Sequence, residues 1–509
     1  MSSTSTTPPS AADGIGFRSE RGPVLGALML TTGLVALDST IIATAVPSIV
    51  QDVGGFTQFP WLFSIYLLTA AVTVPLYGKL ADVLGRKPLL YVGIAVFLLG
   101  SVLCGVAWSM PALIAFRAVQ GIGAGAIQPI SMTVVGDLYS VAERARVQGY
   151  LASVWGVSSV VGPTLGGVFS QYLSWRWIFF VNLPLGAVAA WMLVRHFSEK
   201  VSRRPHTLDY TGAALLTVGC SLVILGLLEG GIAWAWSSPQ SLAVFAVGTA
   251  LLVAFAIVER RAAEPVLPLW VLSRRTLAAG NLTAVTVGAM TIGLSSYVPT
   301  YVQGVLGTGA LVAGFTLAAL TVGWPLAATF SGRLYTRIGF RDTALIGAAF
   351  VLLGAVLCTL LGRTTPVWQV AGACFVVGIG LGFLSSPVVV AVQSVVGWDR
   401  RGVVTGTNMF SRSIGSALGA AVLGAVANAT LASRLAHPPA AVARALPDDP
   451  TSLVLSGSAT TAHGAAAEFV REALYAAAHH VFVGLVAVAL LAVASLLLMP
   501  RRTEPLTFD

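Results

Sequence analysis

The stretch GKLADVLGRK at residues 78–87 returns in altered form as GRLYTRIGFR at residues 332–341. A second pair of matching stretches is GIGAG, which starts at Gly121, and GIGLG, which starts at Gly378. The two pairs are separated by 254 and 257 residues along the chain. Two independent matches at nearly the same separation indicate that the chain contains an internal duplication, so the fold is built from two related halves.

The composition around these repeats is that of a membrane protein. Of the 509 residues, 56% are hydrophobic and only 10% are charged, whereas soluble domains carry about 25% charged residues. The 54 glycines suit closely packed transmembrane helices. This excludes a soluble enzyme, a disordered regulator and a disulfide scaffold. Four single cysteines in apolar stretches are expected to be small core residues: Cys104, Cys220, Cys358 and Cys374.

Apolar stretches of about 20 residues, bounded by polar residues, glycine or proline, predict fourteen membrane-spanning helices. The predicted spans are approximately 25–47, 60–78, 88–108, 112–135, 149–170, 177–196, 209–230, 241–258, 278–302, 312–331, 343–361, 368–390, 403–428 and 480–499. Residues 1–24 lack the pattern of a signal peptide and are expected to form a disordered cytoplasmic tail. The fold class is therefore an all-α polytopic membrane protein.

The distribution of basic residues predicts the orientation of these spans. With both termini in the cytoplasm, most of the 29 lysines and arginines fall in cytoplasmic segments. The outer segments hold only Arg176, Arg363, Arg434, Arg444 and Arg471, and two arginines, Arg117 and Arg412, lie within spans. The net charge of +9 then follows from topology, and we expect no nucleic-acid partner.

The repeat divides the spans into two six-helix bundles with a pair of helices inserted between them. The expected parts are a first bundle at 25–200, the inserted pair at 201–276, a second bundle at 277–500 and a cytoplasmic tail at 501–509. A long outer loop is expected at 429–479, and its later part could form an amphipathic helix that ends at His479 and His480. We interpret these histidines as interface anchors and assign the loop no function. Parallel repeats of six spans are a transporter architecture.

Five motifs relate this chain to a known family: GKLADVLGRK from Gly78, LIAFRAVQGIGAG from Leu113, the segment GPTLGG from Gly162 with Gly156 before it, LDSTIIATAVP in the first span, and WRWIFFVNLPLG from Trp175. On these motifs the sequence resembles the major facilitator superfamily and, within it, the fourteen-span drug:proton antiporters of the EmrB/QacA type. The resemblance covers all the predicted spans. It implies a major facilitator fold and export coupled to protons.

The first motif is predicted to act as a cytoplasmic gate. Gly78 and Gly85 permit a tight turn, and Asp82, Arg86 and Lys87 can form charge pairs beside it. The resemblance implies that this cluster latches the gate. The alternative is a simple positive-inside anchor.

The second copy of this motif has lost two of its charges. It has Thr336 in place of the aspartate and Phe340 in place of the first arginine. We therefore expect its latch to be weaker.

The arginine of the second motif, Arg117, is predicted to lie inside the membrane, where it costs at least a few kcal/mol without a partner. The best available acid is Asp38 in the first span. Burial raises the proton affinity of a carboxylate and a nearby guanidinium lowers it, so a change in their separation can load and release a proton. The resemblance favours this proton-coupling role. The alternative is a static ion pair that holds the two spans together.

The third motif is the most specific pointer to export. Its members are Gly156, Gly162, Pro163, Gly166 and Gly167. Glycines let helices approach closely, and a proline removes a backbone hydrogen bond, so a kinked and tightly packed span is expected. The resemblance implies that this pattern distinguishes antiporters from symporters.

Polar and aromatic residues within spans are candidates for lining a substrate cavity: Trp61, Tyr66, Gln128, Trp155, Asn281, Tyr297, Tyr301, Gln303, Trp324, Gln393, Asn408 and Arg412. The sequence offers no acid partner for Arg412, and its candidate partners are an anionic substrate, a lipid head group and helix-end carbonyls. Glu229 is either a cation-attracting acid or an interfacial group.

The sequence features predict a transporter built from two repeats. The resemblance further implies a proton-coupled exporter in the cytoplasmic membrane, which moves small amphipathic, cationic drugs by alternating access, and we expect it to be a monomer surrounded by lipid. The alternative cargo is a host metabolite, an antibiotic, a siderophore or a lipid. The sequence has no G-x-x-x-x-G-K-[ST] loop, and no intramembrane nucleophile with a base is visible. We therefore expect no ATP drive, no enzymatic activity, no metal and no cofactor other than the coupling proton.

Overall fold

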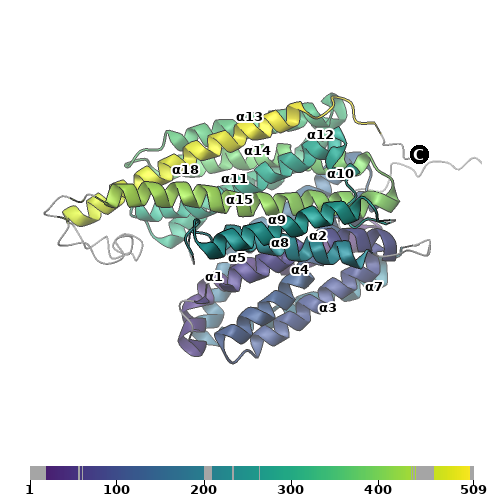
Figure 1. Ribbon diagram of the computed structural model, residues 1–509, viewed down its shortest axis with the longest axis horizontal. Helices are drawn as coiled ribbons and strands as arrows, with labels where there is room; N and C mark the ends of the chain where they lie inside the picture. Colours follow the sequence, from purple (N-terminus) through teal and green to yellow (C-terminus); the bar gives the residue numbers. More distant parts are fainter. Residues whose placement is uncertain are drawn as a thin grey trace, which may run out of the picture.

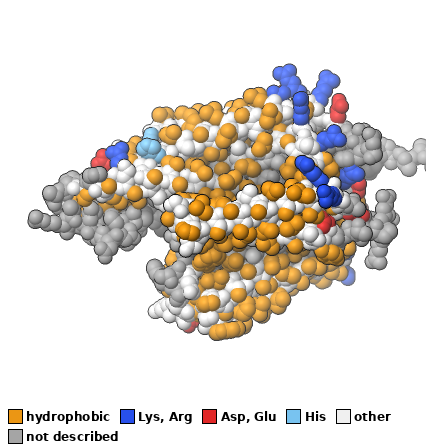
Figure 2. Space-filling view, in the orientation of Figure 1, with side chains coloured by type: hydrophobic (Ala, Val, Ile, Leu, Met, Phe, Trp, Pro, Cys, Tyr) orange, Lys and Arg blue, Asp and Glu red, His pale blue; other side chains and the backbone are white. Residues whose placement is uncertain are grey.

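The computed structural model describes residues 16, 19–54, 58–59, 61–199, 209–231, 234–262, 264–436, 438, 442 and 464–504. Within these residues, 14 helices are long and apolar enough to cross a membrane. The predicted all-α polytopic fold is therefore confirmed. Hydrophobic side chains cover most of the flank of the molecule, as expected for a surface that faces lipid (Figure 2).

The first six spans form one bundle, at the bottom of Figure 1. Its helices are α1 (Gly22–Val53), α2 (Trp61–Leu84), α3 (Arg86–Gly105), α4 (Met110–Leu138), α5 (Val141–Tyr172), and the short α6 (Trp177–Phe180), which continues into α7 (Asn182–His196). The second bundle consists of α11 (Arg275–Gly304), α12 (Ala310–Ile338), α13 (Phe340–Thr359), α14 (Val367–Ser394), α15 (Arg401–Leu435) and α18 (Ala465–Leu497). The 3-10 turn η2 (Trp398–Arg400) precedes α15.

The inserted helices are α8 (Tyr210–Glu229) and α9 (Pro239–Glu259), followed by the short α10 (Trp270–Ser273). Helices α8 and α9 pack against each other, and α8 also contacts α2 and α15. The pair thus touches one helix of each bundle, and Figure 1 shows it lying along the boundary between them.

Both bundles use the same packing plan. Helix α4 packs against α2 and α3, and α14 packs in the same way against α12 and α13. Helix α1 contacts α5 and α7, and its counterpart α11 contacts α15 and α18. The duplication inferred from short sequence matches is therefore a duplication of tertiary structure.

The repeated glycine motifs explain why the packing is conserved between the halves. A methyl group added at Gly123 would lie 2.7 Å from a backbone oxygen of α3, and one added at Gly380 would lie 2.8 Å from a backbone oxygen of α13. The first glycines of the two motifs, Gly121 and Gly378, face the backbones of α2 and α12 in the same way. Each motif lets one helix approach two neighbours at backbone distance.

The long outer loop predicted at 429–479 is partly helical. Helix α15 continues to Leu435, and α18 begins at Ala465 and runs unbroken into the last span. The predicted helix before His479 is thus the first part of α18, because its alanine-rich sequence favours helix. Most of the remaining loop, including Arg444, lies outside the described residues. At the other end of the chain α1 starts at Gly22, and residues 1–15 lie outside the described residues.

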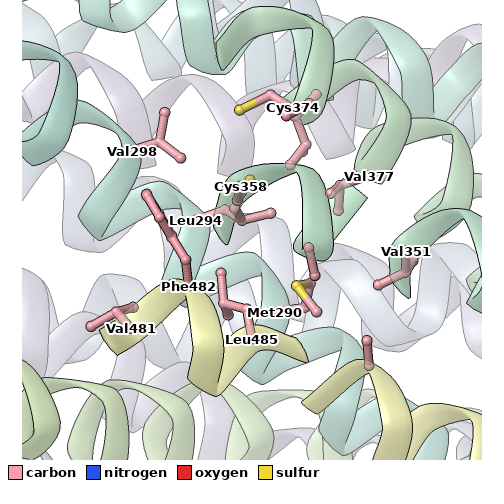
Figure 3. Close-up of a cluster of buried hydrophobic side chains, with 14 of the residues drawn as sticks. Met290, Leu294, Val298, Val351, Cys358, Cys374, Val377, Val481, Phe482 and Leu485 are labelled. Carbon is pink, nitrogen blue, oxygen red and sulfur yellow. The ribbon is translucent and has the colours of Figure 1, made fainter. Parts of the chain in front are cut away.

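The cysteines lie where the sequence predicted. All four are buried free thiols. Figure 3 shows Cys358 and Cys374 in the core of the second bundle among Met290, Leu294 and Phe482. They act as small apolar side chains.

Lysine and arginine side chains gather at one end of the molecule, to the right in Figure 2. We call this the basic end and define it by the α2–α3 and α12–α13 junctions, at Gly85 and Gly339. The positive-inside rule predicts that it faces the cytoplasm.

Candidate functional site

A cavity of about 400 Å³ lies between the two bundles. Helices α1, α4 and α5 line it from the first bundle, and α11, α12, α14 and α15 line it from the second. Of the residues proposed from the sequence, five line this cavity: Gln128, Trp155, Trp324, Asn408 and Arg412. The volume suits a drug-sized molecule.

Most other polar groups of the cavity are small hydroxyls that the sequence analysis did not select. They include Thr32, Thr40, Ser131, Ser159, Thr291 and Thr321. Many of these hydroxyls donate to a carbonyl one turn earlier in their own helix, as Thr321 does to Ala318 at 2.8 Å. Helical serines and threonines leave little sequence signal because they can satisfy themselves in this way.

The remaining candidates do not line this cavity, and their contact with a substrate stays a prediction: Trp61, Tyr66, Asn281, Tyr297, Tyr301, Gln303 and Gln393. Tyr301 is in the core of the second bundle, where it packs edge-on against Phe482 and donates to Gly362. Gln393 donates to the backbone oxygen of Met132 at 3.1 Å and so joins the bundles near the basic end. Hydropathy alone does not fix which face of a span turns toward the centre.

A buried polar cluster lies within the first bundle, around Asp38 and Arg117. The Nη1 atom of Arg117 donates to Oδ2 of Asp38 at 2.6 Å, and both residues are only 1% exposed. The ring of Tyr66 lies 4.1 Å from the guanidinium carbon. The structure therefore brings together the two charged residues that the sequence paired, and it adds a cation–π contact.

Three uncharged residues complete this cluster. Gln120 donates to Oδ1 of Asp38 at 2.8 Å and also to Ser101 at 2.8 Å. Asn182, at the start of α7, donates to the same Oδ1 atom at 3.2 Å. Each of the three residues is fully buried, and none lines the cavity. The carboxylate is thus held by a guanidinium and two amides from α4 and α7, sealed from the cavity.

Helix α1 connects this cluster to the third motif, Gly156 to Gly167, in α5. On the face of α1 that meets α5, Thr40 donates to the backbone oxygen of Ser158 at 2.9 Å, and Thr44 donates to that of Pro163 at 3.2 Å. A methyl group on Gly162 would lie 3.2 Å from the backbone nitrogen of Ile41. The motif therefore packs α5 directly on the helix that carries Asp38.

The first glycine of the motif faces the other bundle. A methyl group on Gly156 would lie 3.2 Å from the backbone oxygen of Thr321 in α12. Gly167, in contrast, has no neighbour within 4 Å of such a methyl group. Helix α5 thus contacts α1 on one side and the second bundle on another, and it lines the cavity through Trp155 between them.

At the basic end, Asp82 binds across the boundary between the bundles. Its carboxylate accepts hydrogen bonds from the backbone nitrogens of Gly402 at 2.7 Å and Val403 at 2.8 Å. These are first-turn nitrogens of α15, where a carboxylate is favoured by free N–H groups and by the helix dipole. Gly78 lies one turn earlier, and its added methyl group would lie 2.8 Å from the backbone oxygen of Gly402.

Arg86 organises the same region and is completely buried. It donates to Asp82 at 3.0 Å, to Asp137 at 2.9 Å and to the backbone oxygen of Trp398 at 2.5 Å. Arg401 of α15 donates to Asp137 at 2.5 Å. Lys87, the remaining charge of the motif, binds the backbone oxygen of Phe197 and stays within the first bundle. The contacts of Asp82, Arg86 and Asp137 join the two bundles at the basic end.

The second copy of this motif makes different contacts. The hydroxyl of Thr336 bonds only within its own helix, and Phe340 packs against Tyr335 with ring centres 5.0 Å apart. Tyr335 in turn donates to the backbone oxygen of Val141 in the first bundle. This copy therefore contributes a neutral hydrogen bond between the bundles in place of an ion-pair network.

At the end opposite the basic end, α1 carries a second acid, Asp52, in a very different setting. Arg176 donates to Asp52 at 2.6 Å, and Trp175 donates to it at 3.0 Å. These hydrogen bonds hold the pKa of Asp52 below its ordinary value. The exposed side chain stays ionised, whereas Asp38 on the same helix is sealed.

Several members of these sites were not found from the sequence. Gln120 lies one turn after Arg117 on α4, and this spacing could have identified it. Asp137 precedes a cluster of arginines and could also have been selected. Ser101 and Asn182 carry no such signal, because an uncharged polar residue in a span has many possible partners.

The comparisons with known proteins agree with this architecture. The family model of the Major Facilitator Superfamily matches residues 28–420. Multidrug resistance protein 3 of Bacillus subtilis is 36% identical over 413 residues, which cover 81% of this chain and 80% of the relative. The multidrug transporter protein MdtP of the same organism is 35% identical over 81% of this chain and 76% of its own length.

Among solved structures, the human organic anion transporter MFSD10 superimposes with a TM-score of 0.63 over 96% of this chain and all of the other. With 16% sequence identity, this likeness concerns the fold alone. Together with the two parallel six-helix bundles and the family match over most of the length, it leads to one conclusion: the chain belongs to the major facilitator superfamily of membrane transporters.

Proposed function

We propose that this protein is a proton-coupled exporter that moves amphipathic compounds out of the cytoplasm by alternating access. The observation that carries the proposal is a sealed carboxylate, Asp38, on the same helix that lines the central cavity through Thr32 and Thr40. Relatives with more than a third of their residues in common are named as multidrug transporters, which supports export of drug-like molecules.

The coupling step that we propose is protonation of Asp38. In the present arrangement Nη1 of Arg117 donates to Oδ2 of Asp38 at 2.6 Å. A proton on the carboxylate removes this attraction and frees Arg117, which then relies on Gln120 and the backbone oxygen of Leu62. Protonation therefore weakens the attraction between α1, which carries Asp38, and α4, which carries Arg117.

Helix α1 can pass this change to the cavity and to the other bundle. It is bonded to α5 through Thr40 and Thr44, and α5 contacts α12 at Gly156. Because α5 also lines the cavity, movement of α1 relative to α4 would alter both the cavity wall and the packing between bundles. Coupled transport requires an element with two states, and both the proton and the cargo must shift the balance between these states.

We further propose that the protein acts as a monomer in the cytoplasmic membrane, with both termini inside. With the basic end in the cytoplasm, the contacts of Asp82 and Arg86 close the cavity on that side. The present arrangement then corresponds to the state that releases cargo outward. A cationic cargo, expected from the resemblance, stays a prediction, and the described lining residues supply no carboxylate in its support.

The test is proton flux in inside-out vesicles with an acidic interior, to which candidate compounds are added. We expect compounds that are transported to dissipate the gradient with the wild type and not with Asp38→Asn. The matched control is Asp52→Asn, the same change on the same helix, at an exposed acid. Full activity of a well-folded Asp38→Asn would refute the coupling role, and loss of activity in both variants would point to an effect of α1 stability.

A further inference from the structure

The central cavity carries one charge, and that charge is positive. Arg412 of α15 is the single ionisable side chain among the residues that line the cavity. Its guanidinium lies 5.8 Å from the ring centre of Trp324. Within the part of the chain that the structure describes, no hydrogen bond or ion pair engages this side chain. Of its three candidate partners, the helix-end carbonyls are therefore not used.

The acids Asp38 and Asp137 lie on helices that line the cavity, and each already has an arginine partner. Asp38 on α1 is bound by Arg117, and Asp137 at the end of α4 is bound by Arg86 and Arg401. Neither aspartate lines the cavity. The acids of the inserted pair, Glu229 and Glu259, are also outside it. The field inside the cavity is thus set by the guanidinium of Arg412.

An unpaired guanidinium at this depth is costly unless water or an anion compensates it. A cleft lined by one sign of charge attracts molecules of the opposite sign and repels those of its own sign. A cation in this cavity would meet Arg412 with no carboxylate to offset the repulsion. The cavity therefore has the electrostatics of an anion site.

The rest of the lining fits the body of such a molecule. Trp155 and Trp324 offer aromatic surface from α5 and α12, one from each bundle. Gln128 and Asn408 add amide groups, and Nδ2 of Asn408 is held by the backbone oxygen of Gly280 at 3.0 Å. An aromatic or alicyclic body can lie between the tryptophans while an anionic end reaches the guanidinium.

We infer that the cavity selects amphipathic molecules with one anionic group, a carboxylate or a phosphate, and that Arg412 is the residue that binds this group. This inference rests on the proposed export function and narrows its cargo. The anionic group comes either from a free organic acid or from the head group of a lipid. In both cases the same guanidinium makes a charge-assisted hydrogen bond.

The test uses three probes with one aromatic body: pyrenebutyrate, its neutral methyl ester, and pyrenebutylamine. Binding is measured by tryptophan-to-pyrene energy transfer on purified protein in nanodiscs of zwitterionic phosphatidylcholine. Wild-type protein is expected to bind the acid more tightly than the amine. Arg412→Gln is expected to weaken the acid on the order of 10- to 100-fold and the ester less than about twofold.

Two further variants control for charge and folding. Arg412→Lys keeps the positive charge and is expected to retain most of the preference for the acid. Arg434→Gln removes an exposed arginine from the far end of the same helix and is expected to change nothing. Unchanged ester binding shows that each variant is folded. Tighter binding of the amine than of the acid by wild type, no measurable binding of the acid, or an equal effect of the two glutamine variants overturns the inference.

Two additional experiments distinguish a lipid head group from a free organic acid, and the anion inference from the export proposal. Adding phosphatidylglycerol to the nanodiscs weakens pyrenebutyrate binding if a lipid head group occupies Arg412, and it has no effect if free acids do. Gradient-driven uptake of the neutral ester into inside-out vesicles tests export without involving Arg412. Ester transport with no charge preference refutes the anion inference alone, whereas charge preference in binding with gradient-driven uptake of neither the ester nor the acid refutes the export proposal alone.

Discussion

At the scale of single residues, the central feature is a carboxylate whose hydrogen bonds all come from inside one bundle. One oxygen of Asp38 accepts a hydrogen bond from Arg117, and the other accepts hydrogen bonds from two side-chain amides. Asp38, Gln120 and Asn182 are all buried, so the loss of either amide would leave an oxygen of Asp38 with one hydrogen bond fewer. The amides are as much part of the proposed proton site as the arginine.

Replacement of Gln120 by leucine tests this view. The change removes one donor from Asp38 and one from Ser101, and we expect it to lower the stability by about 2 kcal/mol. The same substitution at Gln128, two turns later on α4, is the control because that side chain faces the cavity. Thermal unfolding in detergent measures both. Equal shifts in the two unfolding temperatures would contradict a special role for Gln120.

The charged pair could be predicted from the sequence, and its uncharged neighbours could not. Asp38 and Arg117 are isolated charges in separate apolar spans, and the cost of burying either alone makes their pairing the best solution. Asn182 is one of several amides near span ends, with no comparable penalty to name its partner. The charged members of a buried polar cluster can therefore be predicted from the sequence, whereas its uncharged members cannot.

At the scale of elements, α5 is the helix on which the two bundles and the proposed coupling depend. Gly162 and Gly166 bring it to backbone distance from α1, and Gly156 brings it to α12. The glycines of this motif therefore lie on different faces of α5, one toward α1 and one toward α12. Adjacent glycines of the same motif are expected to differ sharply in what they tolerate.

The substitutions Gly166→Ala and Gly167→Ala test this difference. The methyl group at Gly166 would collide with the backbone oxygen of Ile41 and with Thr44, whereas at Gly167 nothing lies within 4 Å. We expect Gly166→Ala to cost about 1–3 kcal/mol and to impair transport. Gly167→Ala should be neutral or raise stability by up to about 1 kcal/mol, since alanine favours helix. Unfolding midpoints and vesicle transport, measured on both variants, decide the matter, and a similar loss at both positions would reject the packing argument.

Spans were predicted more reliably than helix ends. A hydropathy signal exists because about 20 apolar residues must cross the lipid. No such signal marks helix that extends beyond the membrane. Helix α15 continues to Leu435, whereas the span within it was predicted to end at residue 428. Likewise, the faces of the spans were not predictable, which is why Tyr301 was assigned to the cavity and lies in a bundle core.

At the scale of the whole molecule, closure of the basic end depends on contacts that join the two halves. Asp82 of the first bundle binds the first turn of α15 in the second. This bond can form only while the halves are close at that end. Its loss is expected to favour the alternative arrangement, in which the cavity opens toward the cytoplasm.

Asp82→Ala should therefore increase the population in which the basic end is open. The two charge-assisted hydrogen bonds contribute about 1–3 kcal/mol, which corresponds to a shift in the population ratio of roughly 5- to 150-fold. Spin labels on cysteines introduced at the exposed residues Leu84 and Ile338 would report the separation by double electron–electron resonance. The native thiols are buried and should label poorly.

The control for this measurement is Asp342→Ala, which removes an acid in the first turn of α13 within the second bundle. It should leave the distance distribution as in the wild type. A distribution that is unchanged by Asp82→Ala, or changed equally by Asp342→Ala, would show that the bond to α15 does not hold the basic end closed.

The two junctions of the basic end show which part of the repeated motif is free to vary between its copies. Gly85 and Gly339 adopt the same left-handed backbone, with φ of 94° and 92°, although the second copy has Thr336 and Phe340 where the first has Asp82 and Arg86. Another residue would be strained at either corner. The turn and the contacts beside it can therefore vary separately. The side chains beside the turn can be exchanged for others that make a different contact, such as the hydroxyl of Tyr335 in the second copy, whereas the glycine at the turn cannot be replaced without strain.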